Sequence, residues 1–195
     1  MTAPRRATVA ENWPLPVVVV AHHAVADGHP DAYPLQVASK ILSDGQNARI
    51  YRRLVYDTGI ALAAAGVANL LEDPGLFYAY AVVQPGHTVA EAERALVQEL
   101  DRLRAEPVPD RELDRAKKQF TRDYVFGRET IQQKASVLAH ASVLHRGDAG
   151  SADAEYESFQ GVTAADIQRA ARAYFAPETR LVITVVPKPA TGGPQ

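Results

Sequence analysis

The sequence predicts one α+β domain in which an antiparallel sheet carries helices packed on one face. Three observations support this class. The predicted strands cluster near the start, in the middle and at the end of the chain, with helical segments between them. No internal repeat and no long linker divides the 195 residues. A hydrophobic content of 47% in a chain of this length is enough to build a sizeable core.

Each strand prediction rests on a β-branched, small apolar or alternating run that is bounded by turn residues. A valine-rich run after Pro16 predicts the first strand. Two further runs are joined by Asp73-Pro74-Gly75, whose turn chemistry predicts an antiparallel hairpin. The expected strands are residues 17–25, 60–71, 76–84 and 180–186.

Helical periodicity and capping residues predict the helices. Thr88 with Glu91, and Thr163 with Asp166, have the spacing of capping boxes, and Asp31 is expected to cap the first helix. In one helix, four residues are expected to face inward: Ala135, Leu138, Ala139 and Ser142. The expected helices are residues 31–42, 47–56, 88–106, 110–126, 130–144 and 163–176.

Residues 1–13 are expected to form an N-terminal extension, residues 14–188 the folded domain, and residues 189–195 a disordered Pro/Gly tail. No apolar run approaches the roughly 20 residues that a membrane span needs. A net charge of -2 argues against nucleic-acid or anionic-membrane partners. The absence of cysteine excludes disulfides and cysteine-ligated metal sites, and it leaves both a periplasmic and a cytoplasmic location open.

The histidines lack the spacing of a zinc site. His140 and His145 are five residues apart with no acid between them, which places them on different sides of a helix. His22 and His23 are adjacent in a strand and point to opposite faces. His29 and His87 lie in turn sequences. We therefore expect no metal ligands and no cofactor in this chain.

Other catalytic patterns are also missing. No serine lies in a nucleophile elbow, and no glycine-rich phosphate loop is present. The acidic groups Glu91/Glu93, Asp110/Glu112 and Asp153/Glu155/Glu157 are typical of solvated helix starts. Arg49 and Arg53 have the spacing to bind a carboxylate or phosphate together. An exposed basic helix face paired with nearby acids is the commoner outcome for such a cluster, and it is the interpretation we expect for Arg49, Arg52 and Arg53. No catalytic residue is therefore assigned.

Several segments, taken in order, resemble the C-terminal halves of the pitrilysin/insulinase zinc peptidases. Within residues 41–62, Arg49-Ile50-Tyr51 resembles a family helix, and Gly59-Ile60-Ala61 resembles the entry to its next strand. Glu112-Leu113-Asp114-Arg115-Ala116-Lys117 resembles the family's E-L-x-x-A-K segment. Residues 161–167, 173–175 and 182–187 resemble its closing helix and strand. The resemblance covers roughly residues 14–188.

The resemblance implies one half of a clamshell in which two homologous α+β halves close around a peptide. In this family the zinc motif H-x-x-E-H lies in the N-terminal half. That motif is absent here, so the chain is expected to be the zinc-free half of a bacterial metalloendopeptidase and inactive alone. The implied partners are a zinc-bearing half and a peptide substrate, and self-association of the isolated domain is expected where the missing half would pack.

The resemblance also identifies two substrate-binding positions. In many relatives the C-terminal half contributes an arginine and a tyrosine, seven residues apart, to substrate binding and transition-state stabilisation. Alignment on Gly59 places Val55 and Leu62 at these positions. Neither side chain can donate a hydrogen bond, so an electrophilic role is not expected.

Two other functions fit the same fold. One is a non-catalytic structural or assembly subunit, like the core proteins of respiratory complexes. The other is a free-standing module that binds peptides along an exposed sheet edge. Finding H-x-x-E-H upstream would favour the peptidase, and its absence throughout the parent protein would favour the structural subunit.

Overall fold

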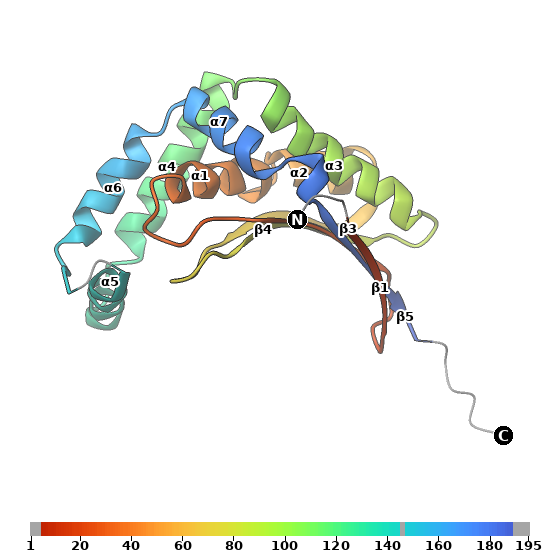
Figure 1. Cartoon of the computed structure of the whole chain (residues 1–195), viewed down its shortest axis with the longest axis horizontal. Helices are drawn as coiled ribbons and strands as arrows, with labels where there is room; N and C mark the ends of the chain where they lie inside the picture. The colour runs from red at the N-terminus through yellow and green to blue at the C-terminus, as the bar shows by residue number, and fades with distance from the viewer. Residues whose placement is uncertain (1–4, 145–146, 189–195) are drawn as a thin grey trace.

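Five strands form one curved sheet in the computed structural model, which describes residues 5–144 and 147–188 (Figure 1). The order across the sheet is β1-β5-β2-β4-β3. The strands are β1 (Arg5–Glu11), β2 (Val17–His23), β3 (Ala61–Asn69), β4 (Leu76–Val83) and β5 (Leu181–Pro187). The predicted α+β class and the hairpin of β3 with β4 are confirmed.

The sheet is mixed, because β1 runs parallel to β5 while the other neighbours are antiparallel. The wholly antiparallel sheet predicted from the sequence is wrong at this edge, and no strand was expected before Val17. All seven residues of β1 are exposed. The strand therefore forms through backbone pairing to β5 and has no buried face that a hydrophobic pattern would reveal.

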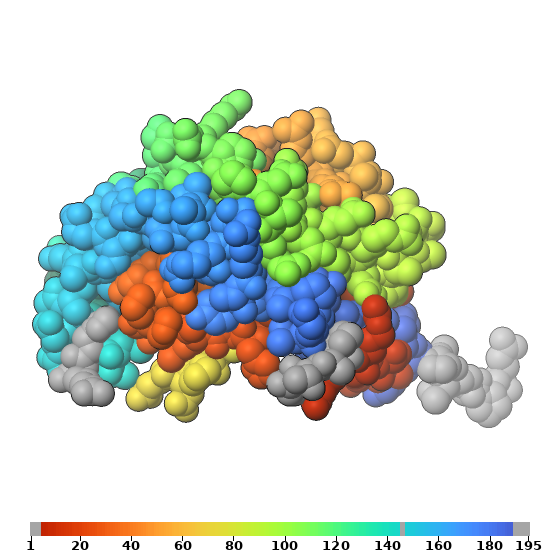
Figure 2. Space-filling view, turned by 45° about the horizontal axis from the view of Figure 1, so that its top comes forward, coloured from red at the N-terminus to blue at the C-terminus, as the bar shows by residue number. Residues whose placement is uncertain are grey.

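All of the helices that cover the sheet lie on its convex face (Figure 1). Figure 2 looks onto this helix layer, in which α3, α6 and α7 lie in front. The helices are α1 (Ala32–Ser43), α2 (Arg49–Tyr51), α3 (Val89–Ala105), α4 (Asp110–Phe126), α5 (Ile131–Leu144), α6 (Ser151–Gly161) and α7 (Ala164–Tyr174), with the π-helical turn η1 (Arg52–Asp57) and the 3₁₀ turn η2 (Pro177–Thr179).

Both predicted capping boxes are confirmed. The Thr88 hydroxyl accepts a hydrogen bond from the Glu91 amide at 3.2 Å, and Thr163 does the same for Asp166 at 3.2 Å. The prediction that the Asp31 side chain caps the first helix is wrong. Asp31 precedes α1 but makes no side-chain cap bond, because its carboxylate instead accepts from the Tyr174 hydroxyl and pairs with Arg169.

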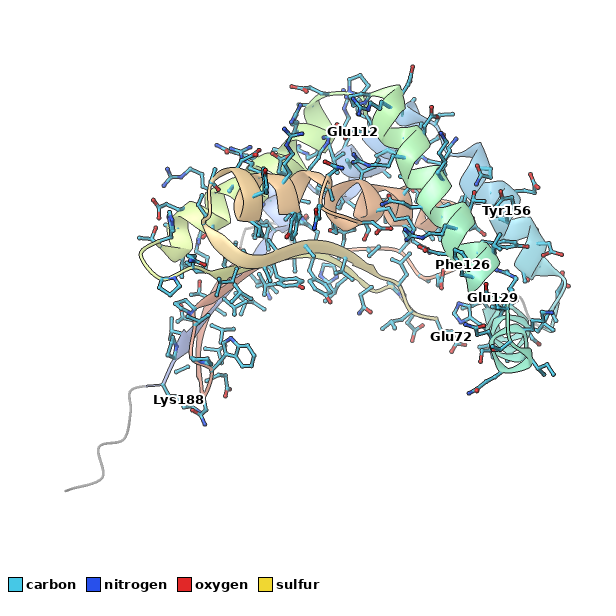
Figure 3. The ribbon with its side chains drawn as sticks, turned by 180° about the vertical axis from the view of Figure 1, so that it is seen from behind. Glu72, Glu112, Phe126, Glu129, Tyr156 and Lys188 are labelled. Carbon is cyan, nitrogen blue, oxygen red and sulfur yellow. The ribbon has the colours of Figure 1, made fainter. Side chains whose placement is uncertain are left out.

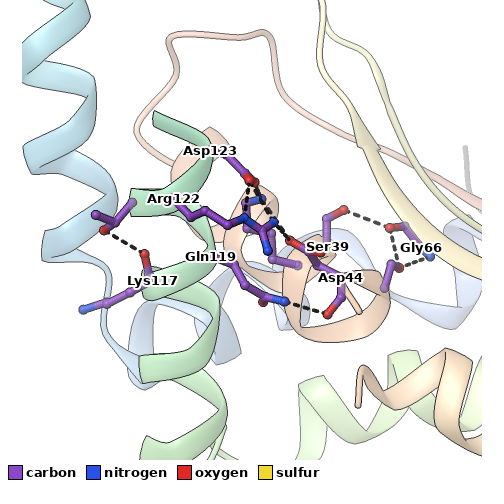
Figure 4. A network of polar contacts seen from close by, with 10 residues as sticks. Ser39, Asp44, Gly66, Lys117, Gln119, Arg122 and Asp123 are labelled. Atoms are coloured by element: carbon purple, nitrogen blue, oxygen red, sulfur yellow. Dashed lines mark hydrogen bonds and ion pairs between the residues drawn. The ribbon is translucent and has the colours of Figure 1, made fainter. Parts of the chain in front are cut away.

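The core lies between the sheet and the helices. On β4 the alternate residues Phe77, Ala79, Ala81 and Val83 are buried against the helix layer. Polar contacts attach the C-terminal end of α1 to its neighbours (Figure 4). Gln119 of α4 donates to the Asp44 carbonyl at 2.9 Å, and Ser39 donates to the Gly66 carbonyl of β3 at 2.8 Å.

The prediction of which α5 residues face inward is wrong. Ala135, Leu138 and Ala139 are exposed, Ser142 is half-buried, and Ala141 is the buried residue of this helix. Helix α5 packs on α6 at one end of the layer, and its apolar residues are spread around the helix without a stripe that would direct one side inward. In the part of the chain that is described, no helix is long and apolar enough to cross a bilayer.

Candidate functional site

The two positions that the family resemblance predicts for the Arg/Tyr pair lie on irregular backbone. Val55 belongs to the π-helical turn η1 and is half-buried against the core. Leu62 lies on the edge strand β3, where the register with β4 shifts between Ala61 and Ala63, and it is 51% exposed. π-helical turns and β-bulges both occur often next to functional sites because each re-aims a side chain. Here both irregularities present aliphatic side chains.

The concave face of the sheet carries no covering helix over its middle strands (Figure 1). The residues of β4 that alternate with the buried set point to this face, and Tyr78, Tyr80 and Val82 are half-buried there. Cross-strand rows extend the surface to both neighbouring strands. These rows are Val17–Val82–Ala63, Val19–Tyr80–Ala65 and Ala21–Tyr78–Val67. The bare face is therefore apolar and aromatic, and it ends at the strand that carries Leu62.

The histidines that the structure describes do not converge on a metal site. Among residues 5–144 and 147–188, no three His, Cys, Asp or Glu side chains are grouped as a metal ion would require. His87 lies 3.8 Å from Glu91, and His140 lies 3.4 Å from Asp27, each with one acid only. His145, which is expected on a different side of the helix from His140, is outside the described residues.

His22 is the one fully buried histidine among the described residues, with 1% of its surface exposed. Its ring packs on Phe175, with 5.6 Å between the ring centroids, and neither ring nitrogen has a hydrogen-bond partner. Burial, together with the positive charge of Arg180, lowers the pKa of His22 to about 4. His22 is thus neutral at pH 7 and is part of the core.

The serines near the hairpin have structural roles. The hydroxyls of Ser39 and Ser43 each donate to the Gly66 carbonyl at 2.8 Å, and the Ser43 oxygen also accepts from the Gly66 amide. These contacts hold α1 against β3. Both hydroxyls therefore serve to pack a helix against a strand.

The sequence did not reveal the environment of the arginine cluster, which consists of Arg49, Arg52 and Arg53. Arg49 is paired with an acid, but its side chain is only 7% exposed, so the expected exposed face is wrong for this residue. Its Nε donates to Glu112 at 2.6 Å, and Arg53 Nη1 donates to Glu99 at 2.8 Å. Glu112 is therefore the partner of a buried arginine as well as part of a helix start.

Helix α4 and the segment formed by α2, η1 and α3 enclose a groove of about 1180 Å³. Figure 3 labels Glu112, one of the lining residues of this groove, at the start of α4. Eight Arg or Lys and four Asp or Glu side chains line it, with Asn47 and Gln119 as the remaining residues. The groove therefore has a surplus of positive charge and no apolar lining residue.

The chain is similar to several solved structures. A protease from Helicobacter pylori matches with a TM-score of 0.88 and 22% identity, over 95% of this chain and 45% of that chain. The inactive peptidase domain of a candidate zinc protease from Bordetella parapertussis matches with a TM-score of 0.79 and 26% identity, over 94% of this chain and 98% of that chain. A chain of complex III from Candida albicans shares the fold, with a TM-score of 0.76 and 16% identity.

These matches differ in how much of each relative the chain spans. It spans less than half of the H. pylori chain and nearly all of the B. parapertussis domain. Comparison with curated proteins gives no match. The model of the peptidase M16 inactive domain matches residues 3–120, which is more than half of the chain. The chain therefore belongs to the peptidase M16 family, as its inactive domain, in agreement with its resemblance to the pitrilysin/insulinase peptidases.

Proposed function

We propose that this chain is the zinc-free half of a two-half zinc metalloendopeptidase and closes the peptide-binding chamber over a zinc-bearing half. The observation that carries the proposal is the bare apolar face of the sheet in a domain of the inactive M16 family. An apolar surface of this kind marks a place where a partner or ligand binds. The family's two-half architecture supplies both, namely the other half and the enclosed peptide.

In this proposal the chain supplies a wall and contacts for an extended peptide, and the zinc-bearing half supplies the chemistry. Zinc, held in that other half, would polarise the scissile carbonyl and activate water. The family resemblance matches Leu62, at the bulge of the edge strand β3, to the family's tyrosine, and in this proposal Leu62 would lie beside the substrate. Val55 and Leu62 would contribute apolar contact without a hydrogen bond to the developing oxyanion.

The test combines the chain with its cognate zinc-bearing half and follows cleavage of an unstructured fluorogenic peptide. We expect no cleavage by the chain alone, cleavage by the mixture, and loss of that cleavage with a chelator. Chelator-sensitive cleavage by the chain alone at stoichiometric zinc would refute the proposal. So would a cognate half that binds zinc and cleaves equally well with and without this chain.

A matched pair of variants tests the surface. Leu62→Glu places a charge at the edge of the bare face, and Leu71→Glu places one on the hairpin loop, where Leu71 is 56% exposed. We expect the first to raise KM or weaken association with the zinc-bearing half, and the second to change neither. Equal effects of both variants would show that this edge is not the contacting surface.

A structural subunit is the second candidate. It is favoured by the aliphatic residues Val55 and Leu62 at the positions of the Arg/Tyr pair, and the complex III chain from C. albicans shares the fold. This function predicts stable association with the companion half but no cleavage by the complex. The activity assay of the mixture therefore separates the two candidates.

A further inference from the structure

The groove between α4 and the α2–η1–α3 segment is built for a charged ligand. All of its lining side chains are charged or carry an amide, with four more cations than anions, although the whole chain has a net charge of -2. Grooves of similar size that bind drug-like molecules are lined mainly by apolar side chains. An apolar ligand is therefore a poor fit, and a ligand with several negative charges is a good one.

One wall offers cations that the protein itself leaves unused. Arg111, Arg115 and Lys118 follow one another along one side of α4, and none makes an ion pair or a side-chain hydrogen bond with another described residue. Other groove arginines are already occupied: Arg49 by Glu112, Arg53 by Glu99, and Arg122 by Asp123. The row on α4 thus supplies the cations of the groove that are wholly unpaired among the described residues.

The floor of the groove has both an unused donor and unused acceptors. Arg49 is buried, and its Nη1 has no partner while its Nε binds Glu112. Glu99 Oε2 and Gln119 Oε1 are also buried without a partner. An inorganic anion such as phosphate can accept from Arg49, but most of its oxygens are acceptors and match the two unpaired acceptors of the protein poorly. A peptide offers carbonyl acceptors and N–H donors together.

The spacing of the row on α4 also fits a polypeptide. At a rise of about 1.5 Å per residue, Arg111 and Arg115 are about 6 Å apart along the helix axis, and Lys118 follows about 4.5 Å later. Alternate side chains of an extended peptide are spaced by roughly 6.6 Å on one side. Acidic residues at every second position would therefore meet these cations in turn.

We propose that this groove binds an extended acidic peptide segment whose Asp or Glu residues alternate along the chain. The cations of the row on α4 bind the carboxylates of the peptide. The peptide backbone forms hydrogen bonds with the floor of the groove, which consists of Arg49, Glu99 and Gln119. The site lies among helices and is separate from the bare face of the sheet. The proposal holds whether or not the chain completes a peptidase.

Binding of a labelled hexapeptide of alternating Glu and Ser to the purified chain, followed by fluorescence anisotropy, tests the proposal. We expect the affinity to be about tenfold or more above that of the matching Gln/Ser peptide, and to fall as salt is added. Tripolyphosphate and citrate serve as competitors without peptide N–H groups. The proposal requires both to compete more weakly than an unlabelled copy of the Glu/Ser peptide.

Variants locate the binding site. Arg115→Gln with Lys118→Gln removes two unpaired cations, so the fold is unaffected, and binding should weaken about tenfold. Arg94→Gln changes an exposed arginine of α3 outside the groove and should leave binding unchanged. Equal weakening by both changes, equal binding of the two peptides, or tighter binding of tripolyphosphate than of the peptide would each overturn the proposal.

Discussion

The Tyr174 hydroxyl donates a 2.7 Å hydrogen bond to the Asp31 carboxylate and thereby joins the last residue of α7 to the residue before α1. Arg169 approaches the same carboxylate at 2.7 Å. Burial favours the neutral acid, but these two contacts outweigh it and hold the pKa of Asp31 below its ordinary value. Burial and the bond to Asp31 raise the pKa of Tyr174 to about 12. The pair connects elements 143 residues apart in the sequence.

Tyr174→Phe removes this bond and is expected to lower the free energy of unfolding by about 1–2 kcal/mol at pH 7, because the lost bond has a charged acceptor. Urea denaturation followed by circular dichroism measures the change. Tyr56→Phe is the control, since Tyr56 is 80% exposed, and it should have little effect. The ionised Asp31 carboxylate stabilises the fold at pH values above its ordinary pKa, and this stabilisation is lost as the pH falls below that pKa. The free energies of unfolding of the native protein and of Tyr174→Phe should therefore become equal in acid. A constant difference down to strongly acid pH would contradict this origin.

His22 makes the stability depend on pH in the mildly acid range. Its pKa is about 4 in the folded protein and ordinary, near 6.5, in the unfolded chain, so the unfolded state binds the proton more readily. The stability due to neutral His22 is complete above about pH 6.5 and decreases as the pH falls toward 4. The expected loss is about 3 kcal/mol, an order-of-magnitude value.

The measurement compares the pH dependence of unfolding in the native protein and in His22→Leu, between neutral pH and pH 4. Asp101, Arg104 and Arg180 surround the ring and are retained in both proteins. The free energy of unfolding of the variant should decrease less steeply as the pH falls, and the part of the decrease that is due to the carboxylates should remain. Identical slopes would mean that folding does not lower the pKa of His22.

Gly66 lies where β3 meets α1. A Cβ atom at this position would be 3.2 Å from Leu42 Cδ1 and 3.4 Å from Ile50 Cδ1, and the Ser39 and Ser43 hydroxyls hold the backbone in place. Gly66→Val is therefore expected to destabilise the protein by about 1–3 kcal/mol through overpacking. Gly161→Ala is the control, because its added Cβ meets no atom within 4 Å. Equal denaturation midpoints for the two variants would show that the side chains around Gly66 rearrange and accommodate the larger residue.

Sequence patterns identified the elements whose signal is local or periodic. The hairpin around Asp73-Pro74-Gly75 and the capping boxes at Thr88 and Thr163 were predicted because turn and cap chemistry involves neighbouring residues only. Strand β1 was missed because an edge strand held by backbone pairing, with every side chain exposed, has no hydrophobic pattern.

The contacts of the candidate sites depend on long-range packing, which spacing alone does not encode. Arg49 and Glu112 are 63 residues apart, and their pairing follows from the packing of α4 on α1, which also contacts α2. Arg49 and Arg53 were recognised as a candidate anion site from their helical spacing. The cations of α4 were not connected with them, because they look like an ordinary solvated helix face until α4 is placed. The site positions Val55 and Leu62 came from the family resemblance and stay a prediction.

The junction of α4 and α5 exposes apolar side chains and is expected to cause self-association. Val125 and Phe126 at the end of α4 are each 56% exposed, and Ile131 at the start of α5 is 88% exposed. Figure 3 shows Phe126 at this end of α4, beside the labelled Glu129. Grouped apolar side chains of this size gain free energy when a second surface covers them. Sedimentation velocity should therefore show a sedimentation coefficient that rises with protein concentration.

Phe126→Ser with Ile131→Ser should reduce this association without unfolding the protein, because both side chains are largely exposed and contribute little to the core. Leu71→Ser, which removes an exposed leucine from the β3–β4 hairpin loop, is the matched control and should associate as the native chain does. If the control variant alone became monomeric, the associating surface would lie at the hairpin. A native chain that stays monomeric at high concentration would show that the α4–α5 junction does not self-associate.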